Sequence, residues 1–411
     1  MTRTKDRINT TSGARILPIR PSPAGASVEL FSGCGGLAMG LSLAEFQHKL
    51  LIEWNREAYE TIIHNKEKGL RHVRDWPYVH DDVRDIQWSK FRGHVDIVAG
   101  GPPCQPFSVG GKANGSLDGR DMWPEAIRAV REIQPKAFLF ENVRGLLRPA
   151  FADYVSWIRA YLVNPEIERK PNEGHVEHLA RLSASKFSSY DVVVAPVNAA
   201  DYGAPQKRHR VVIVGFRKEL GVSLELPRTT HSQDRLVWEK WISGDYWKRH
   251  GLKRQKPSMA PPQEARIMER LRNEMFEPTS MAWRTCRDAF EGLDEPGTRP
   301  DLVNHNFQPG ARVYPGHTGS PIDEPAKALK AGVHGVPGGE NMLAREDESV
   351  RYFSVREAAR LQGMPDDFEF PRSWTESMRQ LGNAVPVTLA KALADWMANQ
   401  IALTNRKQQA A

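Results

Sequence analysis

The chain has 411 residues, of which 40% are hydrophobic, so it can bury the core of one large domain and a smaller one. Its formal net charge of +7 at pH 7 favours a polyanionic partner. No apolar run approaches the roughly 20 residues of a membrane-spanning helix. Its three cysteines are too few for a disulfide framework and have no metal-ligand spacing. We therefore expect neither a membrane protein nor a secreted disulfide scaffold, and a reducing cytoplasm fits best.

The amino-terminal region predicts a disordered arm followed by a nucleotide-type loop. Residues 1–26 are basic and polar, without the apolar segment of a secretory signal. Residues 27–31 are predicted to form a strand that runs into the glycine-rich residues 32–37 and then a helix. Glycines let the backbone approach a ligand, and a helix N-terminus offers free N–H groups. The spacing departs from the dinucleotide fingerprint, so a simple turn is the alternative.

A second predicted strand, residues 51–55, carries an acid and an aromatic side chain at its end. Glu53 lies about 20 residues after the glycine turn, where a Rossmann-type fold places its ribose-binding carboxylate. Glu53 could accept both ribose hydroxyls while Trp54 stacks on adenine. An ordinary exposed strand end is the alternative. Residues 80–86, which include Asp82 and Val83, close a third unit.

The next predicted strand, residues 95–99, leads into a loop that holds Cys104 between prolines. Pro103 and Pro106 fix φ on either side and restrict their neighbours. In open α/β sheets, ligands bind at the carboxyl ends of the strands, and this is where the thiol is expected. A rigid turn with an incidental small hydrophobic residue is the alternative.

Further polar groups follow later predicted strands. Glu141 comes directly after the strand at residues 137–140 and could reach the same ligand as Cys104. If residues 206–210 are extended, one side of that segment carries three polar side chains, namely Gln206, Arg208 and Arg210. The cations of Arg208 and Arg210 suit phosphate contacts, and a solvated strand edge is the alternative interpretation. Residues 163–189 are expected to be a polar surface insertion.

Seven sequence blocks now stand in a fixed order. They are Phe31-x-Gly33-x-Gly35-Gly36, Glu53-Trp54, Asp82-Val83, Pro102-Pro103-Cys104-Gln105, Glu141-Asn142-Val143, Gln206-x-Arg208-x-Arg210 and Gly382-Asn383-Ala384-Val385-Pro386. This series resembles the cytosine-5 DNA methyltransferases over roughly residues 27–218 and 350–400. The resemblance implies an α/β fold with a Rossmann-like mixed, mostly parallel sheet and flanking helices. It also implies a catalytic domain at 27–218 and 350–403 and a smaller target-recognition domain at 219–349.

The resemblance further implies S-adenosylmethionine as the cofactor, S-adenosylhomocysteine as its product, and no metal. The cofactor residues that it implies come from all of these regions: Phe31, Ser32, Gly33, Gly35, Gly36, Leu37, Glu53, Trp54, Asp82, Val83, Gly101, Pro102, Trp123, Asn383, Ala384 and Val385.

Cytosine chemistry independently requires the residue types found here. C5 of cytosine is a poor nucleophile, so the ring must first be attacked at C6, and the thiolate of Cys104 suits that attack. The ring then needs a proton at N3, which Glu141 would supply as a carboxylic acid in a dry pocket. Gln206, Arg208 and Arg210 would hold the phosphate and ring edges of a flipped nucleotide, with Arg208 against the base.

Residues 219–349 differ from the rest in composition. Trp238, Trp241, Trp247 and Trp283 lie near a basic run at 248–256. A DNA-facing surface would use Arg249, Lys253 and Arg254 on phosphates. A charged helix end beside a small core is the alternative. After this segment, Ser354 and Glu357 form a predicted capping box, and apolar residues spaced helically over 389–401 predict a core helix.

The expected partner is double-stranded DNA, with no membrane. We also expect a monomer in the bacterial cytoplasm that is functionally linked to a restriction endonuclease. A transfer-RNA cytosine-5 methyltransferase and a non-enzymatic DNA-binding regulator are the alternatives. The long tryptophan-bearing segment favours a duplex over RNA, and the intact Cys104 and Glu141 favour an enzyme.

Overall fold

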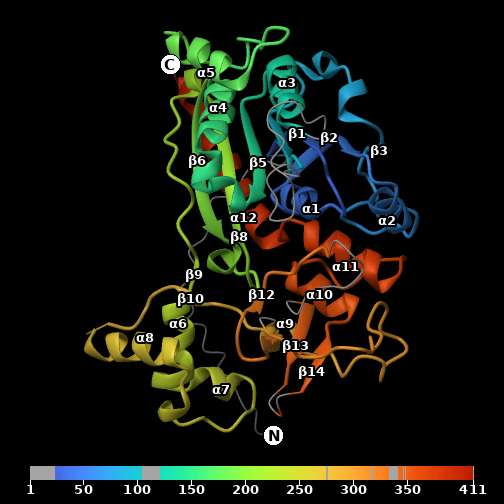
Figure 1. The fold of residues 1–411 in the computed structure, drawn as a ribbon, viewed down its shortest axis with the longest axis vertical. Helices are drawn as coiled ribbons and strands as arrows, with labels where there is room; N and C mark the ends of the chain where they lie inside the picture. The colour runs from blue at the N-terminus through green and yellow to red at the C-terminus, as the bar shows by residue number, and fades with distance from the viewer. Residues whose placement is uncertain are drawn as a thin grey trace, which may run out of the picture.

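The computed structural model describes residues 24–103, 121–274, 276–315, 318–332, 341–345, 347 and 349–410. Its centre is a seven-stranded sheet in the order β3-β2-β1-β4-β5-β8-β6 (Figure 1). The strands are β1 (Gly25–Leu30), β2 (Phe46–Glu53), β3 (Tyr78–His80), β4 (Ile97–Gly100), β5 (Ala137–Val143), β6 (Tyr190–Asn198) and β8 (His209–Arg217). Within this sheet only β8 runs against its neighbours, β5 and β6. The predicted mixed, mostly parallel sheet is confirmed.

Helices cover both faces of the sheet. One face packs against α3 (Trp123–Ile133), α4 (Ala152–Val163) and α5 (His175–Ala184), and the other against α1 (Gly36–Leu43) and α12 (Val387–Ala410). Side chains alternate along a strand, so Val98 and Phe138 enter the first core while Ala99 and Leu139 enter the second. The predicted stripe on the last helix is confirmed, because its members are buried in the second core: Leu389, Leu393, Trp396, Met397 and Ile401.

Two glycines of α1 allow the backbones on this face to approach closely. A Cβ on Gly40 would lie 2.3 Å from Cβ of Ala390 in α12, and a Cβ on Gly36 would lie 2.3 Å from the carbonyl oxygen of Val385. These distances are far below van der Waals contact, so side chains larger than hydrogen do not fit without movement.

A further core joins α2 (Arg56–Glu67) to late parts of the chain, namely α9 (Cys286–Phe290), α10 (Val355–Leu361) and α11 (Trp374–Asn383). Short strands accompany it: β7 (Gln206–Lys207), β11 (Ser320–Pro321), β12 (Ala326–Lys327), β13 (Met342–Ala344) and β14 (Val350–Tyr352). The predicted capping box is confirmed. The Ser354 hydroxyl accepts a bond from the Glu357 amide at 3.1 Å, and the Glu357 carboxylate accepts one from the Ser354 amide at 2.8 Å.

A small separate core lies in the lower part of the molecule in Figure 1, between α6 (Gln233–Val237), α7 (Asp245–Arg249) and α8 (Pro262–Asn273). Trp241 and Trp247 are buried in it, and Trp238 and Trp283 pack against it. Beside Trp241, Lys240 and Glu264 form a buried ion pair at 2.8 Å. The tryptophans of this segment therefore build a small core, which was the alternative interpretation of the sequence.

The structure differs from expectation in several places. β1 begins at Gly25, two residues before the expected start at Ser27. Residues 163–189, expected to be a plain insertion, contain α5, whose buried His178 accepts a hydrogen bond from Trp157 Nε1 at 3.1 Å. Ala326 and Leu329 belong to the core around α2 and α10, so side chains of the 219–349 segment are divided between two cores. None of the described helices is long and apolar enough to span a membrane.

Candidate active site

The carboxyl ends of four neighbouring strands meet at one edge of the sheet. The parallel register pairs Glu29 of β1 with Leu51 of β2 and Ala99 of β4, and pairs Gly100 with Phe140 of β5. The loops that leave these strands therefore share one edge, as expected for a doubly wound sheet. They carry the glycine turn, Glu53 and Trp54, Gly101 and Pro102, and Glu141.

The glycine turn after β1 is held in a fixed conformation. Gly33 and Gly35 have φ of 56° and 82°, values that glycine adopts without a steric penalty, and Phe31 has φ of 57°, which is unfavourable for a bulky side chain. The Gly33 amide donates to Glu53 Oε2 at 2.7 Å, and its carbonyl accepts from the Tyr78 hydroxyl at 2.5 Å. The turn is thus attached to β2 and β3 before α1 begins at Gly36.

The groups expected to hold an adenosine lie beside this turn. Glu53 accepts from the amides of Gly33 and Asn55, the latter at 2.6 Å, so its carboxylate is fixed at the end of β2. Burial raises the pKa of Glu53, while these two N–H groups lower it. Each oxygen keeps a second lone pair for a hydroxyl. Trp54 is 69% exposed, which leaves its ring available for stacking.

Other expected cofactor residues mainly contact the rest of the protein. Asp82 bonds the guanidinium of Arg84, which is the main reason that its pKa is lowered, and Val83 is buried. Trp123 is fully buried, with its ring edge-on to Phe140 at 5.7 Å. Packing therefore accounts for Trp123, and the structure gives it no open face. Leu37, Ala384 and Val385 are also buried, and Asn383 is exposed.

Glu141 lies at the end of β5 in an ion pair. Nε of Arg210 in β8 is 2.5 Å from its Oε1, and both side chains are largely buried. The next residue, Asn142, donates from Nδ2 to the carbonyl of Pro102 at 3.0 Å. This bond ties the start of the cysteine loop to the strand that carries Glu141. Cys104 itself lies outside the described residues.

The side chains of Gln206 and Arg208 bond to other parts of the protein. Both are fully buried. Arg208 donates to the carbonyls of Leu329, Gly382 and Ala384 at 2.7, 2.6 and 3.0 Å. Gln206 donates to the carbonyl of Leu361 at 2.7 Å. These side chains fasten late segments of the chain to the sheet, and of the three expected residues it is Arg210 that pairs with Glu141.

Comparison with known proteins identifies the family. The family described as C-5 cytosine-specific DNA methylase matches this chain over residues 25–163 and 169–399. The chain belongs to this family. The methylase is 30% identical to the type II methyltransferase M.NgoMIV of Neisseria gonorrhoeae over 370 residues, covering 89% of this chain and 95% of that protein. It is 29% identical to M.PspPI of a Psychrobacter species over 405 residues, covering 95% and 85% respectively.

Solved structures support the fold of the methylase. The Dnmt2 methyltransferase of S. pombe superposes with a TM-score of 0.53 at 18% identity, covering 92% of this chain and 99% of that one. A DNMT2 mutant of Spodoptera frugiperda gives a TM-score of 0.55 at 13% identity with the same coverage. The methylase is thus an enzyme of the DNA cytosine-5 class, and its family implies S-adenosylmethionine. The described residues fit that cofactor, because a fixed carboxylate and an exposed indole lie beside a turn with positive φ.

Sequence reasoning missed several residues that support the site. Glu29 is buried on β1, and burial holds its pKa well above the ordinary range. Tyr78 positions Gly33 from β3, and Arg379 of α11 donates to Asn55 Oδ1 at 3.0 Å. Asn55 caps α2, and an asparagine before a helical pattern is a signal that could have been read. The contact of Arg379 spans 324 positions, and no local pattern announces it.

Proposed function

We propose that this methylase transfers a methyl group from S-adenosylmethionine to C5 of a cytosine that is flipped out of a specific duplex DNA sequence. The reaction proceeds through a covalent bond between Sγ of Cys104 and C6 of the base. The relatives are named type II methyltransferases, which supports a role as the modification enzyme of a restriction–modification system. In this role the enzyme would act as a monomer in the bacterial cytoplasm.

The cofactor would be held at the glycine turn. Glu53 accepts hydrogen bonds from the ribose hydroxyls, and Trp54 stacks on the adenine ring. The remaining contacts come from the expected residues around residues 31–37, 82–83, 101–102 and 383–385. When bound, S-adenosylmethionine supplies a methyl group on a positively charged sulfur. The chain's contribution is to orient that group toward the base and to keep water away.

The observation that carries the proposal is the bond from Asn142 to Pro102. It brings the entry of the cysteine loop beside Glu141, whose carboxylate Arg210 holds in place. A nucleophile and a proton donor from two neighbouring strands then act on one ring, as the chemistry of cytosine C5 requires.

The steps conserve atoms and charge. The Cys104 thiolate forms a bond to C6, and the ring receives a proton at N3 from Glu141. C5 then takes the methyl group, whose bond to the cofactor's sulfur breaks so that S-adenosylhomocysteine leaves. C5 loses its own proton to a base, the C6–Sγ bond breaks to release the thiolate, and N3 returns its proton to Glu141. Arg210 keeps the carboxyl group of Glu141 oriented through this cycle. Extrusion of the base from the stack costs a few kcal/mol.

Residues 219–349 would supply most of the target recognition. Lys253 is exposed beside α7, and Arg254 is exposed with one bond to the carbonyl of Ile242. Both suit phosphate contacts. Arg249, in contrast, pairs with Glu239 and Asp288 and is less available.

The test is incubation of the methylase with labelled S-adenosylmethionine and duplex DNA, with transfer RNA in a parallel arm. We expect label at C5 of cytosine in the duplex only. Duplexes that contain 5-fluorocytosine should trap a covalent adduct with the native enzyme, since fluorine blocks the final elimination. The Cys104→Ser variant should bind DNA and form no adduct. An adduct with Cys104→Ser, or transfer to RNA alone, would contradict the proposal. Bisulfite sequencing of a plasmid that carries the gene would then give the target sequence.

A further inference from the structure

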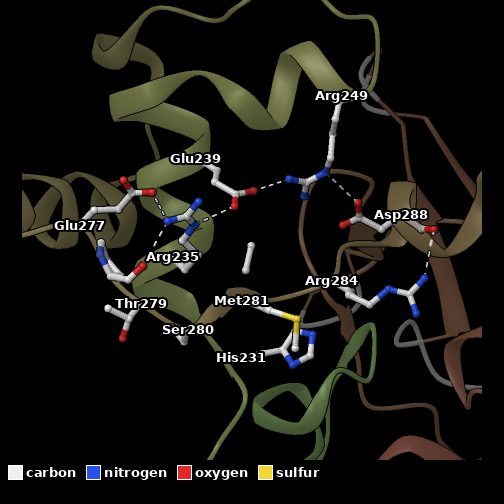
Figure 2. Close-up of a pocket in the computed structure, with 12 residues that line it drawn as sticks. His231, Arg235, Glu239, Arg249, Glu277, Thr279, Ser280, Met281, Arg284 and Asp288 are labelled. Atoms are coloured by element: carbon white, nitrogen blue, oxygen red, sulfur yellow. Dashed lines mark hydrogen bonds and ion pairs between the residues drawn. The ribbon is translucent and has the colours of Figure 1, made fainter. Parts of the chain in front are cut away.

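A cleft of about 680 Å³ opens beside the small core of the methylase (Figure 2). Its walls come from α6, the helical turn Trp238–Ser243, α7, α9 and the segment before α9, which includes β10 (Met281–Ala282). It is lined by polar side chains of several kinds. Three arginines and three carboxylates face one another in it: Arg235, Arg249, Arg284, Glu239, Glu277 and Asp288.

Two of the arginines, Arg235 and Arg249, form ion pairs with carboxylates of the cleft wall. Glu239 stands between them, with Oε1 at 2.8 Å from Nε of Arg235 and Oε2 paired with Arg249. Arg235 also pairs with Glu277, and Nε of Arg249 lies 3.3 Å from Asp288. Figure 2 shows these groups as a continuous chain along the cleft. A ligand could recruit either arginine only by breaking an ion pair, so these two groups serve to fix the shape of the wall.

Arg284 is different. Its side chain is exposed, and within the described part of the chain its guanidinium has one hydrogen bond, from Nη2 to the carbonyl of Asp288 at the limiting distance of 3.5 Å. No carboxylate among the described residues forms an ion pair with it. Arg284 lines the cleft, and most of its donors have no acceptor among the described residues.

The backbone that carries Arg284 is rigid. On one side, the Trp283 amide donates to the carbonyl of Ser232 at 3.1 Å. On the other, Thr285 and Asp288 form a complete capping box, and the Cys286 amide donates to Glu324 at 2.9 Å. A side chain on fixed backbone loses less freedom when it binds than one on a loose loop.

The same segment is attached to the catalytic domain. Nε1 of Trp283 donates to Oδ1 of Asp201 at 2.9 Å, and the ring of His231 lies against Gly203 so closely that a Cβ there would be 2.8 Å from Cε1. Asp201 and Gly203 lead directly to β7 and β8, and Arg210 on β8 holds Glu141. The segment that carries Arg284 is thus connected, through the residues before β7 and β8, to the strand that bears Arg210.

The charge of the cleft decides between two uses of Arg284. Its three guanidinium groups face an equal number of carboxylates, and burial together with Arg284 lowers the pKa of His231, so the imidazole is neutral near pH 7. A cleft without net positive charge does not attract a phosphate backbone. A free guanidinium fork in a neutral cleft is instead suited to a base edge, because guanine offers O6 and N7 as paired acceptors in the major groove.

We propose that Arg284 reads a guanine of the target sequence by donating two hydrogen bonds to its O6 and N7. This inference rests on the proposed function, since it requires duplex DNA as the substrate. Arg284 is then a specificity-determining residue, while Arg235 and Arg249 with their carboxylates hold the reading surface in shape.

The experiment uses a duplex library with random bases, methylated by the full-length protein and sequenced after bisulfite treatment. The native enzyme should show a guanine at a fixed position of its target. Arg284→Ala should lose that preference and fall about 5- to 150-fold in kcat/KM on the native target, the range of one bidentate base contact. Arg284→Gln should shift the preference toward adenine, which an amide pairs with. Arg272→Ala, an exposed arginine of α8 outside the cleft, is the matched control and should keep the native profile.

Two results would overturn the assignment. One is an Arg284→Ala profile that equals the native one. The other is equal weakening on all sequences with a salt dependence flattened by ~0.9, which marks a phosphate contact. If the native enzyme methylates no duplex in the library, the proposed function itself fails, and that result is distinct from an unchanged profile in the variant.

Discussion

The close packing of α1 on α12 leads to a stability prediction in which two effects oppose each other. Alanine at a helix interior is favoured over glycine by about 1 kcal/mol. At Gly40, however, the added Cβ would lie 2.3 Å from Cβ of Ala390, 2.7 Å from the amide nitrogen of Lys391 and 2.8 Å from the carbonyl carbon of Ala390. Ordinary contact needs about 3.5–4.0 Å, so α12 would have to shift by more than an ångström.

Overpacking of this kind typically destabilises by 1–3 kcal/mol. Two of the three atoms are backbone and cannot rotate away, so the upper end applies, and we expect Gly40→Ala to lower the free energy of unfolding by about 2 kcal/mol net of the helix preference. Urea unfolding measures it. The double variant Gly40→Ala with Ala390→Gly removes only the Cβ contact and should recover only part of the loss. A Gly40→Ala protein as stable as the native one, or more stable, would refute this reasoning.

Further predictions concern catalysis, cofactor binding, burial and pH. Glu141→Gln should reduce single-turnover methylation by roughly 10²–10⁴-fold with unchanged cofactor affinity, and an unchanged rate would assign the N3 proton to another group. Trp54→Ala should raise the Kd for S-adenosylmethionine in a titration while DNA binding without cofactor stays nearly intact; equal losses would make Trp54 a structural residue. Glu264→Gln leaves Lys240 as an unpaired buried charge and should lower the free energy of unfolding by about 3–5 kcal/mol, measured in urea, and a native value would show that water reaches the pair. Burial lowers the pKa of His175 to about 4. The stabilising contribution of the neutral imidazole is therefore complete above the unfolded pKa of about 6.5 and is lost as pH falls toward 4. Between pH 7 and 4.5 the His175→Phe variant should lose less stability than the native protein, and equal losses would contradict this.

The sequence predicted those parts of the site that depend on local order. Strand, turn and helix follow one another over a few residues at Gly33, Glu53 and Glu141, and parallel topology then brings their ends together. The capping box at Ser354 is equally local, since its partners are three residues apart. Such features are encoded by neighbouring side chains and need no knowledge of the rest of the fold.

The places where expectation and structure differ are those decided by distant segments. Alternation along an extended segment predicts which side Arg208 faces, and it cannot predict that Leu329 and Gly382 cover that side and accept its hydrogen bonds. Trp123 was expected to contact the cofactor, and the structure buries it with its ring edge-on to Phe140. The tryptophans of residues 219–349 gave no signal that would separate a core from a binding surface, because a composition carries no three-dimensional arrangement.

The contact between Gly40 and Ala390 also has a consequence for synthesis. These residues are 350 positions apart in the chain, which at 5–20 residues per second corresponds to roughly 20–70 s of translation. During that interval the apolar side chains of α1 lack the helix that later covers them. The glycine turn and α1 are therefore synthesised early, but the helix that covers them is synthesised late. Fragments that lack α12 should aggregate when expressed. A nascent chain of this methylase would need a holding chaperone until its last helix emerges from the ribosome.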